Sequence, residues 1–432
     1  MNNQYKLRGL KSFFVLWGSQ AVSSLGSAMT NYALIIWVYR QRGTVTSVAL
    51  LSFFTYLPSI LFCFIAGTLA DKWDKKRIML VSDSVAAMGT LTVFLLFSIG
   101  RLEIWHLYAV NFVISFMNAF QNPASYVAVS LLAPKDQYVR VAGLQTFSNS
   151  LVTVFTPALA SAVLAFAGLK MIFIIDLTTF FIAFLALLFF IKIPSVKAGV
   201  EKKKSGFLKS CLEGLGFLRA HKPVFQLILF FSFINLIAYM TGFGILPAMI
   251  LARTGDNQAT LGLVSSCIGF GTLTGSILVT ALKPAKRKAQ VVFLSCGVSF
   301  LICNILWAVS RNTIIWVLAA FFGNLPLPFL SANLTTIMRT KVPMPLQGRV
   351  FATRDTIQFC TIPLGLFLGG YLADNVFEPF MAGSSPFSRA ISLLVGTGDG
   401  AGIALMFLLT GIMGAVSSFL SLKNKAYKTL DA

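Results

Sequence analysis

Long apolar stretches recur along almost the whole chain and constrain its fold more than any other feature. Twelve of them are long enough to cross a hydrocarbon layer as a helix, which takes about 20 apolar residues. They cover residues 12–39, 45–70, 78–100, 104–132, 138–167, 170–193, 223–251, 259–282, 289–309, 313–338, 346–373 and 400–421. Because backbone polar groups inside lipid must bond within their own segment, the pattern predicts an all-α, polytopic membrane protein with twelve transmembrane helices.

The composition agrees with lipid as the main solvent. Hydrophobic residues make up 56% of the 432 residues and charged residues only 11%, too few to cover a soluble protein of this length. The net charge of +21 would fit a nucleic-acid-binding protein, but the basic residues cluster between the apolar stretches, where membrane topology explains them. We therefore predict membrane lipids as partners and no nucleic acid.

The distribution of basic residues predicts the orientation of the chain. Most of the 35 Lys and Arg residues lie at the N-terminus, in the even-numbered loops and at the C-terminus. Because such segments are retained in the cytosol, both termini are predicted to be cytoplasmic, in a multi-pass protein of the cell membrane. The run from Phe13 to Tyr39 is too long for the apolar part of a signal peptide, so we expect a retained first helix.

The chain also resembles a tandem duplication. The segment from Gly143 to Pro157 resembles the segment from Arg349 to Pro363, about half the chain away. The similarity predicts two pseudo-symmetric six-helix halves, residues 1–193 and 223–432. In the basic cytosolic linker between them, residues 194–222, apolar residues at helical spacing predict an amphipathic helix on the inner leaflet, with a partner-binding helix as the alternative. Residues 375–399 are expected to form an irregular outer loop, and a lid role for it stays open.

A charged segment lies between the second and third apolar stretches. Residues 67–77 read Gly-Thr-Leu-Ala-Asp-Lys-Trp-Asp-Lys-Lys-Arg, and Asp83 follows. The segment resembles the signature of the major facilitator superfamily. The resemblance implies the fold of that superfamily and a gating motif made of Gly67, Asp71, Arg77 and Asp83. Asp71 would face the free N–H groups at the start of the eleventh helix and hold the cytosolic side closed.

Other short segments are similar to the macrolide-efflux branch of drug:proton antiporters in that superfamily. They read Phe-Gln-Asn-Pro-Ala at 120–124, Leu-Leu-Ala-Pro at 131–134 and Gln-Gly-Arg-Val-Phe at 347–351. The resemblance implies a drug exporter that uses proton antiport. Two departures count against antiport: Ile114 lies near the position of an arginine that many such exporters carry, and Thr156, not glycine, precedes Pro157.

Charged residues within the apolar stretches are candidates for coupling and gating. Asp176 follows Lys170 by six residues, which places it about 9 Å along the helix at 1.5 Å per residue. An ionised carboxylate within the hydrocarbon costs roughly 3 kcal/mol unless it is paired, hydrated or protonated. Asp176 is therefore the proton-coupling candidate, and a carboxylate bound by neighbouring hydroxyls is the alternative. Arg354 and Asp355 are expected to form an ion pair near the cytosolic gate.

Polar residues in the stretches expected to surround a central cavity are candidates for substrate binding. They are Gln20, Ser24, Asn31, Gln145, Asn149, Asn235, Tyr239 and Gln358. Each of them could instead bridge two helices. As a set they predict a moderately polar cavity with aromatic walls, suited to amphipathic small molecules.

The remaining residues offer little for other classes of function. Residues 271–276 lack the lysine of a phosphate-binding loop, and the two histidines and six cysteines show no ligand spacing, so we expect no nucleotide hydrolysis, no metal, no cofactor and no enzyme. The sequence predicts a monomeric secondary active transporter that exports amphipathic small molecules, such as macrolide-like drugs, by proton antiport with alternating access. The alternatives are a facilitator, an importer, a lipid or siderophore transporter of the same fold and, from another class, a channel or scramblase.

Overall fold

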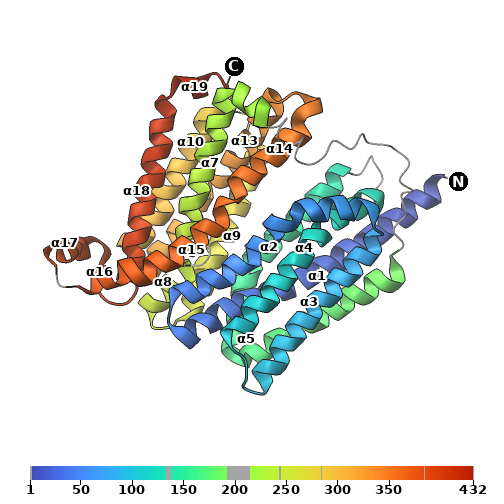
Figure 1. Ribbon diagram of the computed structural model, residues 1–432, viewed down its shortest axis with the longest axis horizontal. Coiled ribbons are helices and arrows are strands. Elements are labelled where there is room, and N and C mark those ends of the chain that lie inside the picture. The colour runs from blue at the N-terminus through green and yellow to red at the C-terminus, as the bar shows by residue number, and fades with distance from the viewer. Residues whose placement is uncertain are drawn as a thin grey trace. The chain divides into compact units, whose positions relative to one another are not determined.

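The computed structural model describes residues 2–132, 138–191, 215–242, 245–283, 285–383 and 385–431. Within these ranges, the side chains of residues 2–11, 63–72, 126, 130, 138–143, 146, 344–349, 352, 425 and 428 lie outside the description. Every regular element in the described ranges is a helix, so the predicted all-α class is confirmed. Figure 1 shows the helices in chain order, coloured from blue at the N-terminus to red at the C-terminus.

The chain divides into two compact units. Residues 1–41 and 51–204 form the first, and residues 42–50 and 205–432 form the second. The described helices of the first part of the chain are α1 (Asn2–Arg42), α2 (Val45–Lys72), α3 (Lys75–Ser98), α4 (Ile104–Leu132), α5 (Tyr138–Leu185) and the π-helical turn η2 (Ala186–Phe190). The start of α2 thus groups with the second unit and the rest of α2 with the first.

The second part of the chain contains more and shorter helices. They are α7 (Lys222–Thr241), α8 (Leu246–Thr254), α9 (Gln258–Ala281), α10 (Lys288–Phe300), η3 (Leu301–Ile305), α11 (Leu306–Val309), α12 (Thr313–Asn324), α13 (Leu327–Lys341), α14 (Met344–Phe359), α15 (Thr361–Leu372), η4 (Ala373–Phe377), α16 (Glu378–Ala382), α17 (Pro386–Val395), α18 (Ala401–Lys423) and α19 (Lys425–Lys428). The predicted linker, residues 194–222, falls outside the described residues up to residue 214, and residues 215–220 are helical.

The apolar helices account for the twelve predicted spans. Ten segments of the described residues are long and apolar enough to cross a membrane. One of them, Phe147–Phe190, has 44 residues, about 66 Å of helix at 1.5 Å per residue and far more than one crossing needs. It turns at Gly168, whose φ of 73° is open mainly to glycine, so it holds two spans. The 29-residue α4 supplies a further apolar helix.

Prolines divide two of the predicted stretches. The run 313–338 consists of α12 and α13, which meet at Pro326. The run 346–373 consists of α14 and α15, and α14 ends at Phe359. In a continuous helix, the Phe359 carbonyl would accept a hydrogen bond from the backbone N–H of residue 363. Because Pro363 has no N–H and its ring crowds that carbonyl, the helix is interrupted there.

The prediction that residues 375–399 are irregular was wrong, whereas their place on the outer side stays a prediction. The segment contains the end of η4, then α16 and α17. The Ser385 side chain accepts a hydrogen bond of 3.0 Å from the backbone N–H of Ser388, and Pro386 occupies the first turn, a combination that favours a helix start. The helix ends at Gly396, which has a φ of 86°.

Each unit has its own buried apolar core. In the first, Phe13, Met79 and Leu187 come from α1, α3 and η2 and are almost fully buried. In the second, residues of α7, α10 and α13 pack with the C-terminal residues Tyr427 and Leu430. These cores fix the helices that carry the polar residues described next.

Candidate functional site

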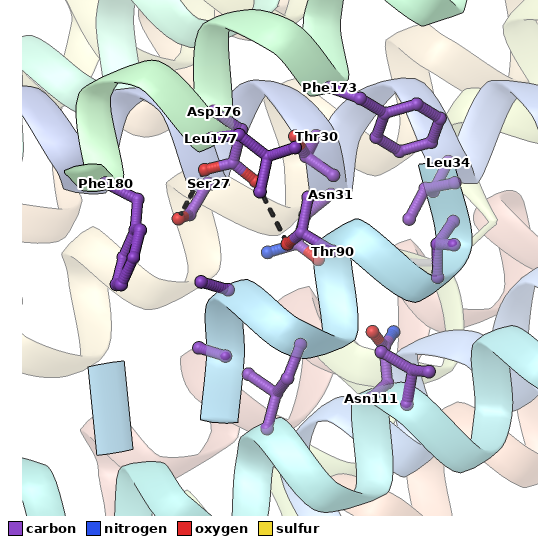
Figure 2. Close-up of a pocket in the computed structure, with 15 residues that line it drawn as sticks. Ser27, Thr30, Asn31, Leu34, Thr90, Asn111, Phe173, Asp176, Leu177 and Phe180 are labelled. Carbon is purple, nitrogen blue, oxygen red and sulfur yellow. Dashed lines mark hydrogen bonds between the residues drawn. The ribbon is translucent and has the colours of Figure 1, made fainter. Parts of the chain in front are cut away.

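Asp176 lies in the second span of α5 and is only 3% exposed. Its Oδ1 accepts a hydrogen bond of 2.9 Å from Ser27 of α1, and its Oδ2 accepts one of 3.3 Å from Thr90 of α3. The Thr30 hydroxyl faces the same carboxylate without the geometry of a hydrogen bond (Figure 2). Three helices therefore converge on one buried acid.

A small cavity of about 70 Å³ surrounds this carboxylate. Its polar lining consists of Ser27, Thr30, Asn31, Thr90, Asn111 and Asp176, and apolar side chains such as Phe173 and Phe180 complete the wall. Asp176 and Thr30 are buried, whereas Ser27 and Asn31 are exposed. The recess therefore places a buried acid beside exposed polar side chains of α1.

Two glycines let the helices around this recess approach closely. A Cβ at Gly26 of α1 would collide with the Thr179 hydroxyl and lie 3.1 Å from the Cα of Asp176. A Cβ at Gly89 of α3 would lie 2.9 Å from a methyl carbon of Val110 in α4. Close backbone approach through small residues is the usual way that membrane helices pack, and here it brings α1 to the acid and α3 to α4.

The charge of Asp176 has no basic partner among the lining residues that the structure describes. The Ser27 and Thr90 hydroxyls stabilise a carboxylate by donation, but they leave its net charge in place. A buried net charge inside a membrane span is costly, so the site favours a state in which a proton or another cation neutralises it. This chemistry fits a coupling site.

The acid of the sequence motif, Asp83, has different partners. Its Oδ2 accepts a hydrogen bond of 3.3 Å from Gln20 of α1, and its Oδ1 accepts a short one from Gln121 of α4. Among the described residues, no hydrogen bond or ion pair joins Asp83 to Arg77. The backbone N–H of Arg77 donates instead to the Asp74 side chain, which caps α3 at 2.8 Å.

The other two members of the motif, Gly67 and Asp71, lie outside the described side chains. The gating role of the motif therefore stays a prediction. Gln20, expected to line the substrate cavity, bridges α1 to α3 through Asp83.

Polar residues of α1 lie along one exposed face. Ser24, Ser27 and Asn31 are all exposed and lie three and four residues apart, which places them on the same side of the helix. In the first span of α5, Asn149 is exposed and Gln145 is half-buried. Polar faces within membrane spans are rare on the lipid side, so these positions indicate a water-accessible interior surface.

The candidates of the second unit cluster where α7 meets α14 and α15. The Asn235 side chain donates to the backbone carbonyl of Gln358 at 3.2 Å, a helix-bridging bond. Gln358 is 7% exposed, and its amide nitrogen has no hydrogen-bond partner among the residues that the structure describes. Tyr239 contacts α15 at Gly365, where an added Cβ would lie 3.2 Å from the Tyr239 Cβ. Gln358 thus has a donor group left for a ligand or water.

The predicted ion pair is present in the structure. A nitrogen of the Arg354 guanidinium lies 2.7 Å from Oδ1 of Asp355. The central carbon of this guanidinium group lies 5.1 Å from the centre of the Phe351 ring, a cation–π contact. The pair is therefore local to α14, and its gating role stays a prediction.

Several residues that the structure places at these contacts were not identified from the sequence. The hydroxyls of Ser27, Thr30 and Thr90 are unremarkable in a membrane helix, and only the tertiary fold aims them at Asp176. Asp374 of η4 binds the start of α2 through the backbone N–H groups of Val45 and Thr46, at 3.0 and 2.7 Å. The sequence offered one signal for this contact. Asp374 is an acid near the end of an apolar stretch, and an acid can bind the free N–H groups of a helix N-terminus.

The long apolar helices, the two compact units and the polar recesses within the spans define a multi-pass helical membrane protein. Residues 16–366 match the model of the Major Facilitator Superfamily, and the chain belongs to this family of transporters.

Relatives and solved structures agree with this assignment. The chain is 26% identical over 378 residues to Macrolide efflux protein A of Streptococcus pyogenes, with 87% of this chain and 91% of that protein covered. It is 23% identical over 384 residues to Multidrug efflux pump Tap of Mycolicibacterium fortuitum, with 84% and 89% covered. The crystal structure of a variant of the nucleoside transporter NupG has a TM-score of 0.70, with 13% identity and 97% and 100% of the two chains covered. The predicted superfamily fold is confirmed.

Proposed function

We propose that this transporter exports amphipathic small molecules, macrolide-like drugs or related natural products, by proton antiport with alternating access. Relatives of nearly the same length are a macrolide efflux protein and a multidrug efflux pump, which supports export and this substrate class. The exposed polar face of α1 in the first unit and the amide of Gln358 in the second each offer hydrogen bonds to partly polar molecules.

The observation that carries the proposal is the buried Asp176 in its recess. A proton that enters past Ser27 and Asn31 binds a carboxylate oxygen and removes the net charge. Release of the proton on the other side restores the charge, which the donated hydrogen bonds of Ser27 and Thr90 stabilise. Because the charged and neutral forms differ strongly in their cost of burial, protonation can bias two conformations of the transporter.

The proposal includes the organisation predicted from the sequence. Two six-helix halves, residues 1–193 and 223–432, provide alternating access in the cell membrane, with both termini in the cytosol and one chain as the working unit. Gly67, Asp71, Arg77 and Asp83, together with the Arg354–Asp355 pair, serve the cytosolic gate.

Transport in proteoliposomes tests the proposal. Purified protein is reconstituted with an imposed pH gradient, and a fluorescent macrolide and an internal pH dye are followed together. We expect the wild type to move the macrolide against its gradient while protons flow the other way. Asp176→Asn should abolish uphill transport, because an amide neither gains nor loses the proton.

The matched control is Glu103→Gln, which neutralises an exposed carboxylate of the first unit. It should transport as the wild type does. Uphill transport by Asp176→Asn would remove Asp176 from the mechanism. Wild-type transport that is only downhill and indifferent to pH would show a facilitator instead of an antiporter.

A further inference from the structure

The Asp176 recess is built almost entirely of oxygen ligands. The carboxylate supplies two oxygens, Ser27, Thr30 and Thr90 supply three hydroxyls, and Asn31 adds an amide oxygen to the lining (Figure 2). Nitrogen and sulfur ligands from His or Cys are absent among the described lining residues. Oxygen-only sets suit hard cations and not transition metals.

The Thr30 hydroxyl is a second observation that points to a ligand beside the acid. It is 6% exposed, and its oxygen has no hydrogen-bond partner in the described part of the chain. A buried hydroxyl without a partner carries a desolvation cost that a bound ion or water would remove. Ser27 and Thr90 donate hydrogen bonds to the carboxylate, so their oxygen lone pairs remain to coordinate a cation.

Charge and size select among hard cations. One carboxylate neutralises one monovalent cation, whereas a divalent cation would leave a net positive charge buried in the membrane span. The cavity of about 70 Å³ exceeds the roughly 30 Å³ that one water takes up in the liquid, so it has room for a small dehydrated ion and one water. Asp176 is the one titratable group among the described lining residues, so a proton and a cation would compete for it alone.

We propose that Asp176 and the hydroxyls of Ser27, Thr30 and Thr90 form a binding site for a dehydrated sodium ion, in competition with the proton. Sodium enters past the exposed Ser27 and Asn31 and exchanges its water for the hydroxyl and carboxylate oxygens. The inference rests on the proposed function for the use of the site in coupling, but not for the binding itself, which needs no exported substrate.

Binding of radioactive sodium to the purified full-length protein in detergent tests the site. We expect saturable binding that unlabelled NaCl displaces, that KCl displaces poorly, and that falls as the pH is lowered and the proton occupies Asp176. Asp176→Asn should abolish it. Thr30→Val, which keeps the shape and removes one ligand, should weaken sodium binding at least about tenfold.

The control for Thr30→Val is Thr92→Val, which removes an exposed hydroxyl of α3 that bonds only to its own helix at Met88. It should bind sodium as the wild type does. Sodium should also raise the thermal unfolding midpoint of the wild type and of Thr92→Val but not of Asp176→Asn, which keeps the test valid if the Asn variant is less stable.

Equal sodium binding by the wild type and Asp176→Asn would overturn the proposal, as would unchanged affinity in Thr30→Val. A midpoint that depends on pH through Asp176 but not on sodium would leave a proton site alone, which overturns the sodium site and keeps proton antiport. Sodium binding without any macrolide transport would instead support the site and contradict the proposed substrate class.

Discussion

At the scale of single residues, hydroxyl groups replace water inside the membrane spans. Pro58 interrupts the backbone hydrogen bonds of α2, because it has no N–H to donate. Ser115 of α4 binds the backbone of α2 beside this proline. Its hydroxyl donates a hydrogen bond of 2.6 Å to the Thr55 carbonyl and accepts one of 3.1 Å from the Ser59 N–H. One side chain therefore satisfies two backbone groups of a neighbouring helix that lipid could not satisfy.

Ser115→Ala should destabilise the first unit. It removes both bonds and leaves the half-buried Ser59 N–H without this partner, a loss of about 1–3 kcal/mol in the free energy of unfolding. The measurement is the thermal unfolding midpoint in detergent micelles. Ser84→Ala, which removes a hydroxyl bonded only to Leu80 of the same helix, should lower the midpoint much less. Equal midpoints for the two variants would contradict this role of Ser115.

The sequence identified Asp176 because a lone acid in an apolar stretch is conspicuous, and it missed the partners of Asp176 for a physical reason. Ser27 and Thr90 lie 149 and 86 residues away and reach the acid only through the packing of three helices. Hydroxyls cost little in a membrane helix because they can bond to their own backbone, so their presence carries no signal of a site. Gln121 was quoted only as part of a motif, because it lies 38 residues from its partner Asp83 and meets it only through helix packing.

At the scale of helices, the contacts at the helix ends are the most informative feature. The start of α2 is capped by Asp374, whose carboxylate accepts the N–H groups of Val45 and Thr46 and the Thr46 hydroxyl, the last at 2.6 Å. Gly370 allows the approach, because a Cβ there would lie 2.9 Å from the Thr46 Cα. An acid at a helix N-terminus satisfies free N–H groups and interacts favourably with the helix dipole. The cap is internal to the second unit, with which residues 42–50 group.

Asp374→Ala should loosen the first turn of α2 and little else. Loss of an N-cap costs about 0.5–2 kcal/mol, which corresponds to roughly two- to thirty-fold faster hydrogen exchange of the Val45 and Thr46 amides. Exchange measured by mass spectrometry on a peptide that contains this turn checks the prediction. Asn375→Ala removes a bond to Tyr371 of the same segment and should leave the turn unchanged. Unchanged exchange in Asp374→Ala would show that the cap contributes nothing.

The extent of the helices followed from the sequence better than their breaks did. Apolar length predicts a span because lipid leaves the backbone no alternative to a helix. The break at Gly168 was anticipated between two stretches, but α17 was not, because a ten-residue helix depends on the Ser385 cap and on Pro386 in its first turn. Such short helices are decided by local capping and not by average hydropathy.

At the scale of the whole molecule, charge and apolar length together specify how the chain lies in the bilayer. The described loops carry their basic residues unevenly: Lys75, Lys76 and Arg77 crowd the start of α3, whereas Arg101 is alone between α3 and α4. Lys76 also donates to the backbone carbonyls of Leu188 and Ile191, where η2 ends. Basic residues at a helix C-terminus satisfy free carbonyls, so the same lysine helps to orient the chain and closes a helix end.

The orientation can be tested by labelling single cysteines in whole cells with a membrane-impermeant maleimide. The native cysteines are first replaced, and a cysteine is then introduced at one of four exposed positions: Arg101, Arg389, Lys286 or Thr429. Because the basic segments should stay in the cytosol, we expect labelling at Arg101 and Arg389 in intact cells, and at Lys286 and Thr429 only after permeabilisation. Labelling at Thr429 in intact cells would place the C-terminus outside. It would also contradict the proposed direction of export, because the whole chain, and Asp176 with it, would then be inverted between the cytosol and the outside.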